Sequence, residues 1–281
     1  MKIGFIGQGW IGRNYADDFE ARGYEVVRYA LEEPYKQNKP LIKECDITFI
    51  AVPTPTTPEG FDSSFVVDAL SNIGVGKIAV IKSTTEPGLV ASLQEQFLDV
   101  IVLHSPEFLV EKTAAYDAAN PNRNIVGIPI DTFAHRDAAK KVLSVLPTAP
   151  YSSVMSSLDS ELVKYAGNCF LYTKVLFMNT LYDVVTQSGG DWSKVKEALV
   201  NDPRVGTSHT EPIHASGRGA GGHCFIKDFE AFRQFYKTTV GADEAFSLMT
   251  AAVAYNNDLL IKSNKDIELL KGVYGDNQNV G

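Results

Sequence analysis

The chain has 281 residues, of which 44% are apolar and 21% charged, values that are typical of a globular protein with about two domains. Lys and Arg number 26 against 34 Asp and Glu, and the net charge of −8 argues against nucleic acid or an anionic membrane as a general partner. The three cysteines form no disulfide framework, and neither a signal-peptide pattern nor a long apolar segment is evident. We therefore expect a cytoplasmic protein with reduced thiols.

The first half of the chain alternates short β-rich runs with amphipathic helical patterns. This alternation predicts an α/β fold with a doubly wound parallel sheet of the Rossmann type. Several runs are almost entirely apolar, as expected for strands that are covered on both faces. The predicted strands are 2–6, 25–29, 47–52, 78–82, 100–104 and 124–128. The predicted helices are 11–22, 63–73, 88–97 and 132–146.

The second half of the chain has a helical pattern. The β signal stops after Pro147 and Pro150, which predicts an all-helical domain. Its predicted helices are 157–186, 191–200, 228–236 and 243–262, followed by a polar, frayed end at 272–281. The expected division is a Rossmann domain at 1–150, a helical domain at 151–265 and a tail at 266–281.

A glycine motif lies directly after the first predicted strand. Its glycines permit a tight turn and let a pyrophosphate approach a helix N-terminus, which predicts dinucleotide binding. The motif consists of Gly7, Gln8, Gly9, Trp10, Ile11 and Gly12. Ala30 stands where an acidic residue commonly binds the ribose of NAD, although Glu32 or Glu33 could reach it. NAD is the expected cofactor, and Arg28 and Lys36 leave NADP as the alternative.

Polar loops follow the next strands, at the sheet edge where such folds bind ligands. Each loop alone would be ordinary turn chemistry, but together they could line the cofactor and the reacting carbon. Glu107, at the end of the fifth strand, could accept a proton or position a water, or be a solvated loop acid. The other candidates in these loops are Val52, Thr54, Pro55 and Thr84.

The long predicted helix carries two polar residues on one face, Lys164 and Asn168, four positions apart. Two such donors can stabilise an oxyanion, and a solvated stripe beside an apolar run is the alternative. Arg204, in the loop that follows, could bind a phosphate or be a surface arginine.

The glycine-rich segment 217–228 carries the thiol of Cys224, followed by Lys227 and Asp228. A thiolate is a strong nucleophile that cations stabilise, so a thiol on an open loop among charged groups predicts covalent catalysis. A small buried cysteine after a flexible loop is the alternative. We expect no metal site, because Cys224 and the neighbouring histidines lack a common zinc-ligand spacing.

Together and in this order, the motifs resemble the UDP-glucose/GDP-mannose dehydrogenase family, from Met1 to about Leu260. Each motif alone is weak, but the ordered set is highly specific. Besides the glycine motif it comprises V-P-T-P (52–55), S-T (83–84), S-P-E-F-L (105–109), D-x-x-x-P-x-R (117–123), E-x-x-K-Y-x-x-N-x-F-L (161–171), D-P-R-V-G (202–206) and G-G-H-C-F-x-K-D (221–228).

The resemblance implies a role for each matching position. The implied catalytic residues are the nucleophile Cys224, the oxyanion donors Lys164 and Asn168, and Glu107, Asp228 and Thr84, which would handle protons and the hydrolytic water. Cofactor contacts are implied for Glu111 and Lys227 in addition to the glycine motif and the polar loops. The implied substrate contacts are Glu107, Phe108, Leu109, Lys164, Asn168, Arg204, Gly219 and Gly221.

The implied reaction is the NAD-dependent oxidation of a nucleotide sugar, UDP-glucose above all, from the C6 alcohol to the carboxylate. Cys224 would hold the aldehyde as a thiohemiacetal and then as a thioester that water cleaves. A homodimer through the helical domain is implied, with Arg204 reaching the substrate of the partner. We expect the C-terminal nucleotide-binding domain of this family to be missing, so a separate chain that supplies it is a further implied partner.

Two other functions remain open. The β-hydroxyacid dehydrogenases also join a dinucleotide domain to a helical domain and carry a Lys and an Asn four apart, as Lys164 and Asn168 are. Such an enzyme removes one hydride and needs no thiol, which leaves the segment 217–228 unexplained. The other alternative is a truncated NAD-binding protein with little activity.

Overall fold

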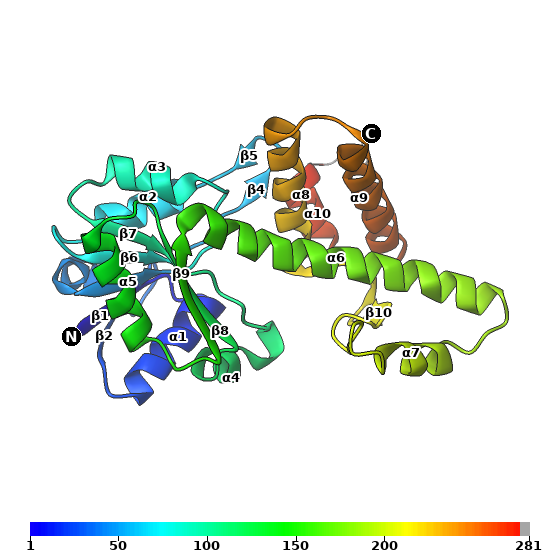
Figure 1. Ribbon diagram of the computed structural model, residues 1–281, viewed down its shortest axis with the longest axis horizontal. Helices are drawn as coiled ribbons and strands as arrows, with labels where there is room; N and C mark the ends of the chain where they lie inside the picture. The colour runs from blue at the N-terminus through cyan, green and yellow to red at the C-terminus, as the bar shows by residue number, and fades with distance from the viewer. Residues whose placement is uncertain (276–281) are drawn as a thin grey trace. The chain divides into compact units, whose positions relative to one another are not determined.

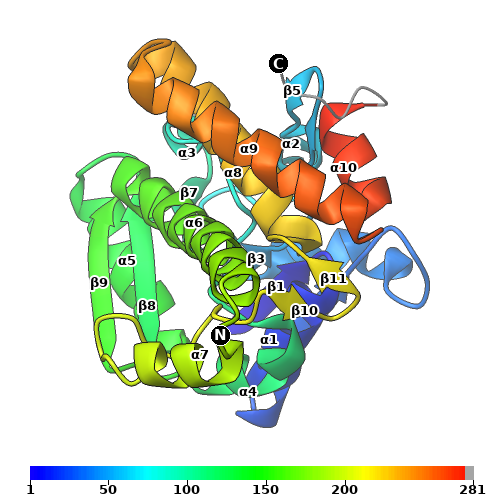
Figure 2. The ribbon, with the colours of Figure 1, turned by 90° about the vertical axis from the view of Figure 1, so that its right-hand side faces the viewer.

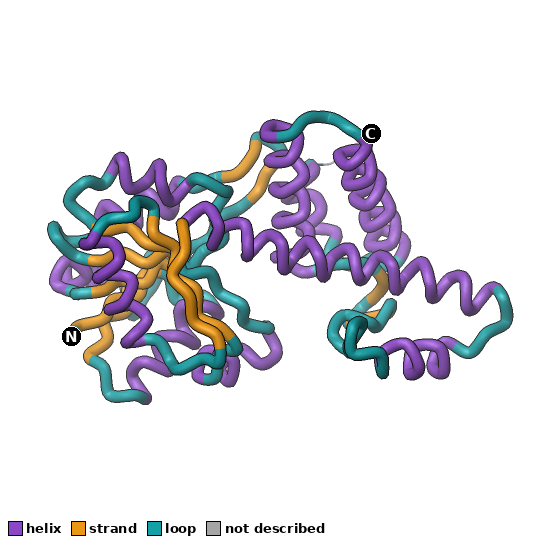
Figure 3. The backbone as a smooth tube through the Cα atoms, viewed as in Figure 1, coloured by secondary structure: helices purple, strands orange, loops and turns teal. Residues whose placement is uncertain are grey.

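The computed structural model describes residues 1–275, in which the chain divides into two compact units. The first unit consists of Met1–Thr54 and Asp62–Lys164, and the second of Pro55–Phe61 and the chain from Tyr165 onward. Figure 1 follows the chain from the N-terminus, and Figure 3 shows the long strands in the first unit and mainly helices in the second. No helix in residues 1–275 is long and apolar enough to cross a membrane.

The first unit is built around a sheet with the strand order β2-β1-β3-β6-β7-β8-β9. Neighbouring strands are parallel except for β7 and β8, so the expected Rossmann-type sheet is confirmed. The strands are β1 (Lys2–Ile6), β2 (Glu25–Tyr29), β3 (Ile47–Ile50), β6 (Ile78–Ile81), β7 (Ile101–His104), β8 (Arg123–Ile128) and β9 (Tyr151–Ser156).

Apolar side chains on both faces of this sheet explain why helices cover it. β3 and β6 are buried at every residue, as expected for central strands of a doubly wound sheet. On one face the rings of Phe5, Phe19 and Phe49 pack with centroids no more than 5.3 Å apart. That face is covered by α1 (Trp10–Ala21), α4 (Ala114–Ala119) and α5 (Phe133–Val145). The other face is covered by the 3-10 helix η1 (Lys36–Glu44), α2 (Ser64–Ser71) and α3 (Leu89–Gln96).

The last strand of the sheet differs from the prediction. The prediction that β structure ends after Pro150 is wrong, because Tyr151–Ser156 forms β9, which pairs in parallel with β8. β9 is an edge strand whose residues are exposed or half-buried, so it lacks the apolar run that marks a covered strand. Its hydrogen bonds to β8 hold it in the sheet, and the first unit extends to Lys164 instead of ending at 150.

The second unit is a helical region, as predicted, with two short antiparallel hairpins added to it. Its helices are α6 (Ser157–Gln187, whose first residues belong to the first unit), α7 (Trp192–Val200), α8 (Gly222–Thr239), α9 (Glu244–Lys262) and α10 (Ile267–Tyr274). The hairpins are β4 (Thr56–Thr57) with β5 (Gly60–Phe61), and β10 (Ile213–His214) with β11 (Gly217–Arg218). Figure 2 shows α8, α9 and α10 packed beside one another.

Two boundaries in the second unit differ from the prediction. α8 begins at Gly222 and not at Asp228, because the backbone is already helical at Gly222, directly after the N-cap residue Gly221. The predicted tail contains α10, whose Leu270 and Val273 are buried against Ile226 and Leu260. Residues 276–281, the rest of the predicted tail, lie outside the described residues.

Candidate active site

The glycine motif forms the predicted turn between β1 and α1. Gly7 has a φ of +90°, and a Cβ there would lie 2.2 Å from the carbonyl oxygen of Ala51. A Cβ on Gly12 would lie 2.0 Å from the carbonyl oxygen of Gly7, so both positions require glycine. Gly9 precedes the first residue of α1, and a Cβ on it would meet no atom within 4 Å. The turn thus leaves open space at a helix N-terminus, which fits the pyrophosphate of a dinucleotide.

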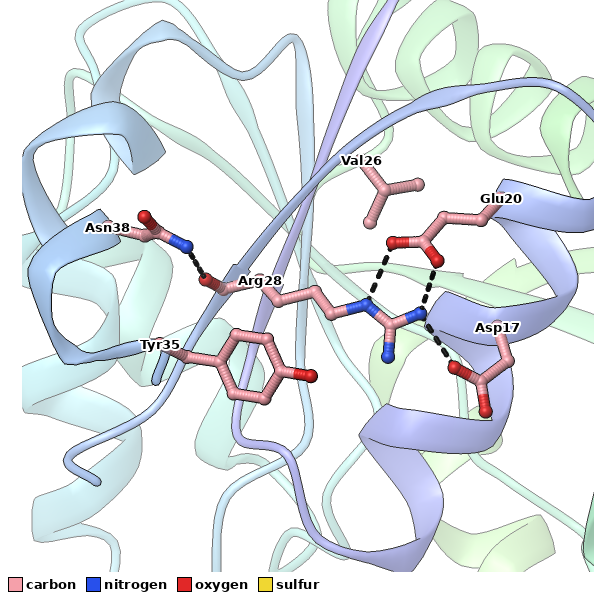
Figure 4. A pocket seen from close by; sticks show the side chains of 6 residues that line it. All are labelled: Asp17, Glu20, Val26, Arg28, Tyr35 and Asn38. Carbon is pink, nitrogen blue, oxygen red and sulfur yellow. Dashed lines mark hydrogen bonds and ion pairs between the residues drawn. The ribbon is translucent and has the colours of Figure 1, made fainter. Parts of the chain in front are cut away.

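The side chain of Arg28, near the end of β2, forms ion pairs within the first unit. Its guanidinium lies 2.6 Å from Asp17 and 2.7 Å from Glu20, both on α1. Figure 4 shows the side chain reaching from β2 to these two carboxylates, with the Tyr35 ring beside it. Because two carboxylates already neutralise this charge, Arg28 is not the free cation that a 2′-phosphate would need, so Arg28 does not favour NADP.

The two polar loops near the glycine motif are joined by a hydrogen bond. The hydroxyl of Ser83 donates to the carbonyl oxygen of Val52 at 2.7 Å. Thr54 and Thr84, the hydroxyl-bearing candidates of these loops, are both buried. The loops at 52–54 and 83–84 are therefore adjacent in the first unit, whereas Pro55 belongs to the second unit.

Glu107 and Lys164 form a buried ion pair. The Lys164 Nζ atom lies 2.7 Å from Glu107 Oε1 and donates to the Glu107 carbonyl oxygen at 2.9 Å. Leu109 N donates to the other carboxylate oxygen of Glu107. Both side chains are less than one tenth exposed, so neither the solvated loop acid nor the solvated helix stripe describes them. A buried carboxylate and ammonium in contact can exchange a proton with a reactant or stabilise its charge.

Lys82 is a charged neighbour of this pair that the sequence reasoning passed over. It is fully buried and donates to the carbonyl oxygen and the hydroxyl of Ser105, while its ammonium lies 4.3 Å from the centre of the Tyr15 ring. Burial lowers the pKa of Lys82 to about 7, and the nearby charge of Glu107 opposes that effect. The sequence does carry a signal for Lys82, because this lysine directly follows the all-apolar run of β6.

Glu161 is the second buried charge that the sequence reasoning did not place in the site. Its carboxylate accepts hydrogen bonds from Gly88 N at 2.7 Å and Val90 N at 3.0 Å, at the N-terminus of α3. Burial raises the pKa of Glu161 to about 7, although these backbone donors favour the ionised form. Glu161 therefore joins the N-terminal part of α6, which also carries Lys164, to the loop that carries Thr84.

Cys224 lies in the first turn of α8 and is half-buried, so the predicted open loop is wrong. A helix N-terminus stabilises negative charge, which favours the thiolate form of a cysteine there. Cys224 and Asp228 are one turn apart and share a face of α8. Asp228 is buried, accepts a hydrogen bond of 2.6 Å from the Asn168 amide and pairs with Lys227 at 2.5 Å.

The predicted residues thus fall into two groups. In the first unit the structure brings together Glu107 and Lys164, and in the second unit Asn168, Lys227 and Asp228. Arg204 lies outside both groups, with an 88% exposed side chain that pairs with Asp202. Of the remaining candidates, Phe108 is half-buried beside the Arg123 guanidinium, Leu109 is half-buried, Glu111 is exposed in the 3-10 helix η2 (Glu111–Thr113), Gly219 is buried and Gly221 is half-buried.

Comparison with known protein families decides the assignment. The model of an NAD binding domain matches residues 33–143, and the model of a central domain from the same family matches residues 159–258. The chain belongs to the UDP-glucose/GDP-mannose dehydrogenase family. These are NAD-dependent nucleotide-sugar dehydrogenases, and NAD is the cofactor of the first unit. The glycine motif and the α10 region lie outside the two matched ranges.

Curated members of this family are similar to the chain over part of their length. The UDP-glucose 6-dehydrogenase TuaD of Bacillus subtilis is 33% identical over 229 residues, which cover 76% of this chain and 47% of TuaD. The UDP-glucose 6-dehydrogenase of Rickettsia conorii is 30% identical over 226 residues, which cover 76% and 51% of the two chains. The chain spans about half the length of the curated relatives it matches.

Solved structures show the same fold. A UDP-glucose dehydrogenase from Pyrobaculum islandicum has a TM-score of 0.78 and 27% identity, over 92% of this chain and 68% of that one. The 3-hydroxyisobutyrate dehydrogenase of Mycobacterium tuberculosis has a TM-score of 0.71 over 97% of this chain and 98% of that one, but only 14% identity. The second comparison shows a shared fold alone.

The open space at Gly9 yields a test of the NAD site. Gly9 has a φ of −65° that alanine adopts without strain, so Gly9→Ala should leave the fold intact and place a methyl group where the pyrophosphate approaches. We expect the Kd for NAD, measured by calorimetry, to rise by about tenfold or more with an unchanged melting temperature. Gly272→Ala in α10, where a Cβ also meets no atom within 4 Å, is the matched control. Equal NAD affinity in both variants would contradict this site.

The raised pKa of Glu161 predicts a pH dependence of stability. The folded state holds this proton to about pH 7, whereas the unfolded chain releases it near its usual pKa of 4.5. The contribution of Glu161 to the free energy of unfolding is therefore complete below pH 4.5 and is lost as the pH rises to about 7. The total loss is roughly 3 kcal/mol.

Urea unfolding from pH 5 to 8 measures this loss. We expect the wild type to lose stability relative to Glu161→Gln across this range, because glutamine does not titrate. Glu95→Gln, which removes an exposed carboxylate from α3, is the control. Parallel pH profiles for the wild type and Glu161→Gln would show that burial does not raise this pKa.

Proposed function

We propose that this chain oxidises the C6 alcohol of a nucleotide sugar, with UDP-glucose as the first candidate, to the carboxylate through a covalent bond to Cys224. The observation that carries the proposal is the face of α8 on which Cys224 precedes the buried Asp228 by one turn, with the amide of Asn168 bound to that carboxylate at 2.6 Å. A nucleophile, a proton-handling carboxylate and an amide donor are the groups that this chemistry requires. Similarity to the UDP-glucose 6-dehydrogenases supports the choice of sugar.

NAD, when bound, supplies the hydride acceptor for both oxidation steps. In this proposal the thiolate of Cys224 adds to the aldehyde carbon that the first step produces, and the new C–S bond holds the carbon in a thiohemiacetal. After the second step the carbon is a thioester. Water attacks that thioester, the C–S bond breaks, and Cys224 recovers its thiol while the sugar leaves as a carboxylate. The whole conversion consumes one water and two NAD for each sugar.

The buried charges would handle the protons and oxyanions of these steps. Asp228 lies on the same face of α8 as Cys224 and can take a proton from the attacking water. Its contacts with Asn168 and Lys227 hold its carboxylate in place. Lys164 is an ammonium donor in contact with Glu107 and can stabilise the alkoxide of the substrate while Glu107 accepts its proton. Thr84 would position the water.

A homodimer through α6 is part of the proposal. One face of α6 in the second unit is exposed and uncharged, with residues at alternating spacings of four and three, the pattern of a helix-packing seam. The face consists of Ala166, Phe170, Thr173, Phe177, Thr180, Val184 and Gln187. Exposed phenylalanine rings on such a face favour burial against a second copy. The exposed Arg204 would then reach the substrate of the partner, as the family resemblance implies.

A β-hydroxyacid dehydrogenase is the second candidate. The match to a 3-hydroxyisobutyrate dehydrogenase covers nearly the whole of both chains at 14% identity, so the two proteins share a fold. That reaction removes one hydride and leaves Cys224 unused. The number of NADH molecules formed for each substrate molecule separates the two functions, because the proposed reaction forms two and this alternative forms one.

Replacement of the thiol tests the proposed chemistry. With a panel of UDP-glucose, GDP-mannose and UDP-N-acetylmannosamine, we expect the wild type to form two NADH and one carboxylate per molecule of its sugar. Cys224→Ser should form no carboxylate, because an alkoxide leaves a carbonyl far less readily than a thiolate and the covalent step is lost. Cys45→Ala, which removes a thiol buried beside the sheet, is the control. Unchanged carboxylate formation by Cys224→Ser, measured by mass spectrometry, would rule out the mechanism.

Charge on the α6 face tests the dimer. Phe177 is 59% exposed, and Phe177→Glu would place a carboxylate in the proposed interface, where it would lose its water. We expect a dimer for the wild type and a monomer for this variant, measured by light scattering at micromolar concentration. Val75→Glu, at a residue that is 78% exposed in the first unit, should remain dimeric. A dimer of Phe177→Glu with the stability of the wild-type dimer would exclude this face.

A further inference from the structure

The glycine-rich segment 217–222, which leads to Cys224, packs closely against residues 263–266, the turn between α9 and α10. A Cβ on Gly221 would lie 2.0 Å from Asp266 Oδ2, and a Cβ on Gly217 would lie 2.5 Å from the Ser263 side chain. Gly219 also has a φ of +89°, which disfavours any other residue. The glycines of this segment therefore allow its backbone to approach the polar side chains of the turn.

Polar side chains of α9 and of this turn bind the backbone of the segment directly. Asn256, which is fully buried on α9, accepts from Ala220 N at 2.7 Å and donates to Ala220 O at 3.1 Å. Ser263 Oγ accepts from Arg218 N at 3.0 Å. Since each of these backbone groups would otherwise need water or a strand partner, the side chains take the place of a neighbouring strand.

Lys265 supplies donors for the carbonyl oxygens on the same segment. Its Nζ atom lies 3.0 Å from Gly219 O and 3.4 Å from Gly217 O, and the side chain is only 6% exposed. Burial lowers the pKa of Lys265, while the neighbouring charge of Asp266 favours the ammonium. A buried ammonium is costly unless it is hydrogen-bonded. The two carbonyl oxygens therefore stabilise the buried Lys265, and Lys265 in turn satisfies these two acceptors.

Asp266 contacts the first residue of α8. Gly221 precedes α8 and has no side chain with which to cap it, but Asp266 Oδ2 accepts from Gly222 N, the first residue of α8, at 2.8 Å. Asp266 itself has a φ of +54° and precedes α10. A carboxylate at a helix N-terminus stabilises the helix start, so this contact favours a helix that already includes Cys224.

We propose that Asn256, Ser263, Lys265 and Asp266 are positioning residues for Cys224, which act by holding segment 217–222 so that the thiol stands in the first turn of α8. The inference rests on the proposed function of Cys224 as the nucleophile. Ser263, Lys265 and Asp266 lie beyond the residues 159–258 that match the family's central domain. The match to the central domain therefore does not cover this turn.

The substitution Lys265→Met tests the inference, because methionine has a similar length and no donors. Without the ammonium, two carbonyl oxygens of the segment lose a partner and the segment should open more often. We expect amide hydrogen exchange in 217–224, followed by mass spectrometry, to become about tenfold faster or more. The kcat for carboxylate formation should fall by about tenfold while the KM for the sugar changes by less than about twofold, since the thiol is misplaced but the sugar is still bound.

Lys262→Met is the matched control. Lys262 lies one turn earlier, is exposed and pairs with Asp258, so its loss should change neither exchange in 217–224 nor kcat. Ser263→Ala is a milder second variant in case Lys265→Met does not fold. It removes one acceptor and should raise exchange at Arg218 by about threefold.

The outcomes separate this inference from the proposed function. Exchange in 217–224 that stays at the wild-type rate in both Lys265→Met and Ser263→Ala overturns the inference, whether or not the protein makes carboxylate. Faster exchange with an unchanged kcat also overturns it, because the turn then stabilises the segment without positioning the thiol. A wild type that makes no carboxylate from any nucleotide sugar contradicts the proposed function and, with it, the positioning role of the turn, whereas the exchange result alone overturns only the inference.

Discussion

The first two turns of α6 depend on buried charges that have partners. Glu161 accepts hydrogen bonds from two backbone amides at the start of α3, and Lys164 binds the carboxylate and carbonyl oxygen of Glu107. A buried ionisable group without such partners would cost several kcal/mol, so these contacts stabilise the position of the helix start on the sheet. Because α6 continues without a break to Gln187, the same helix carries Asn168 into the second unit, one turn beyond Lys164.

The second unit uses a similar principle for the segment before Cys224. There the charged and polar side chains of α9 and the following turn bind backbone groups, in place of the strand or helix contacts that such groups usually make. In both units the groups proposed for chemistry are placed by polar side chains that meet backbone donors and acceptors. Such contacts have strict distances and angles, which apolar packing alone would not impose.

Predictions from the sequence were accurate where one local signal dominates. The apolar runs of β1, β3, β6 and β7 predicted covered strands, and the glycine motif predicted the turn into α1. The edge strand β9 was missed because its stability comes from pairing with β8, which leaves no periodic apolar pattern. The start of α8 was placed six residues late because glycines predict a loop, and the contact that favours the helix comes from Asp266, 44 residues away.

The sequence by itself determined the family, the Rossmann-type sheet, NAD as the cofactor and the residue types available for chemistry, because these follow from short motifs in a fixed order. Only the tertiary structure decided which charges are bound to which partners. Arg28 is neutralised by α1, Lys82 and Glu161 are buried beside the site, and the thiol lies on a helix rather than a loop. The physical reason is that burial and hydrogen bonding depend on residues far apart in the chain, and no local pattern records them.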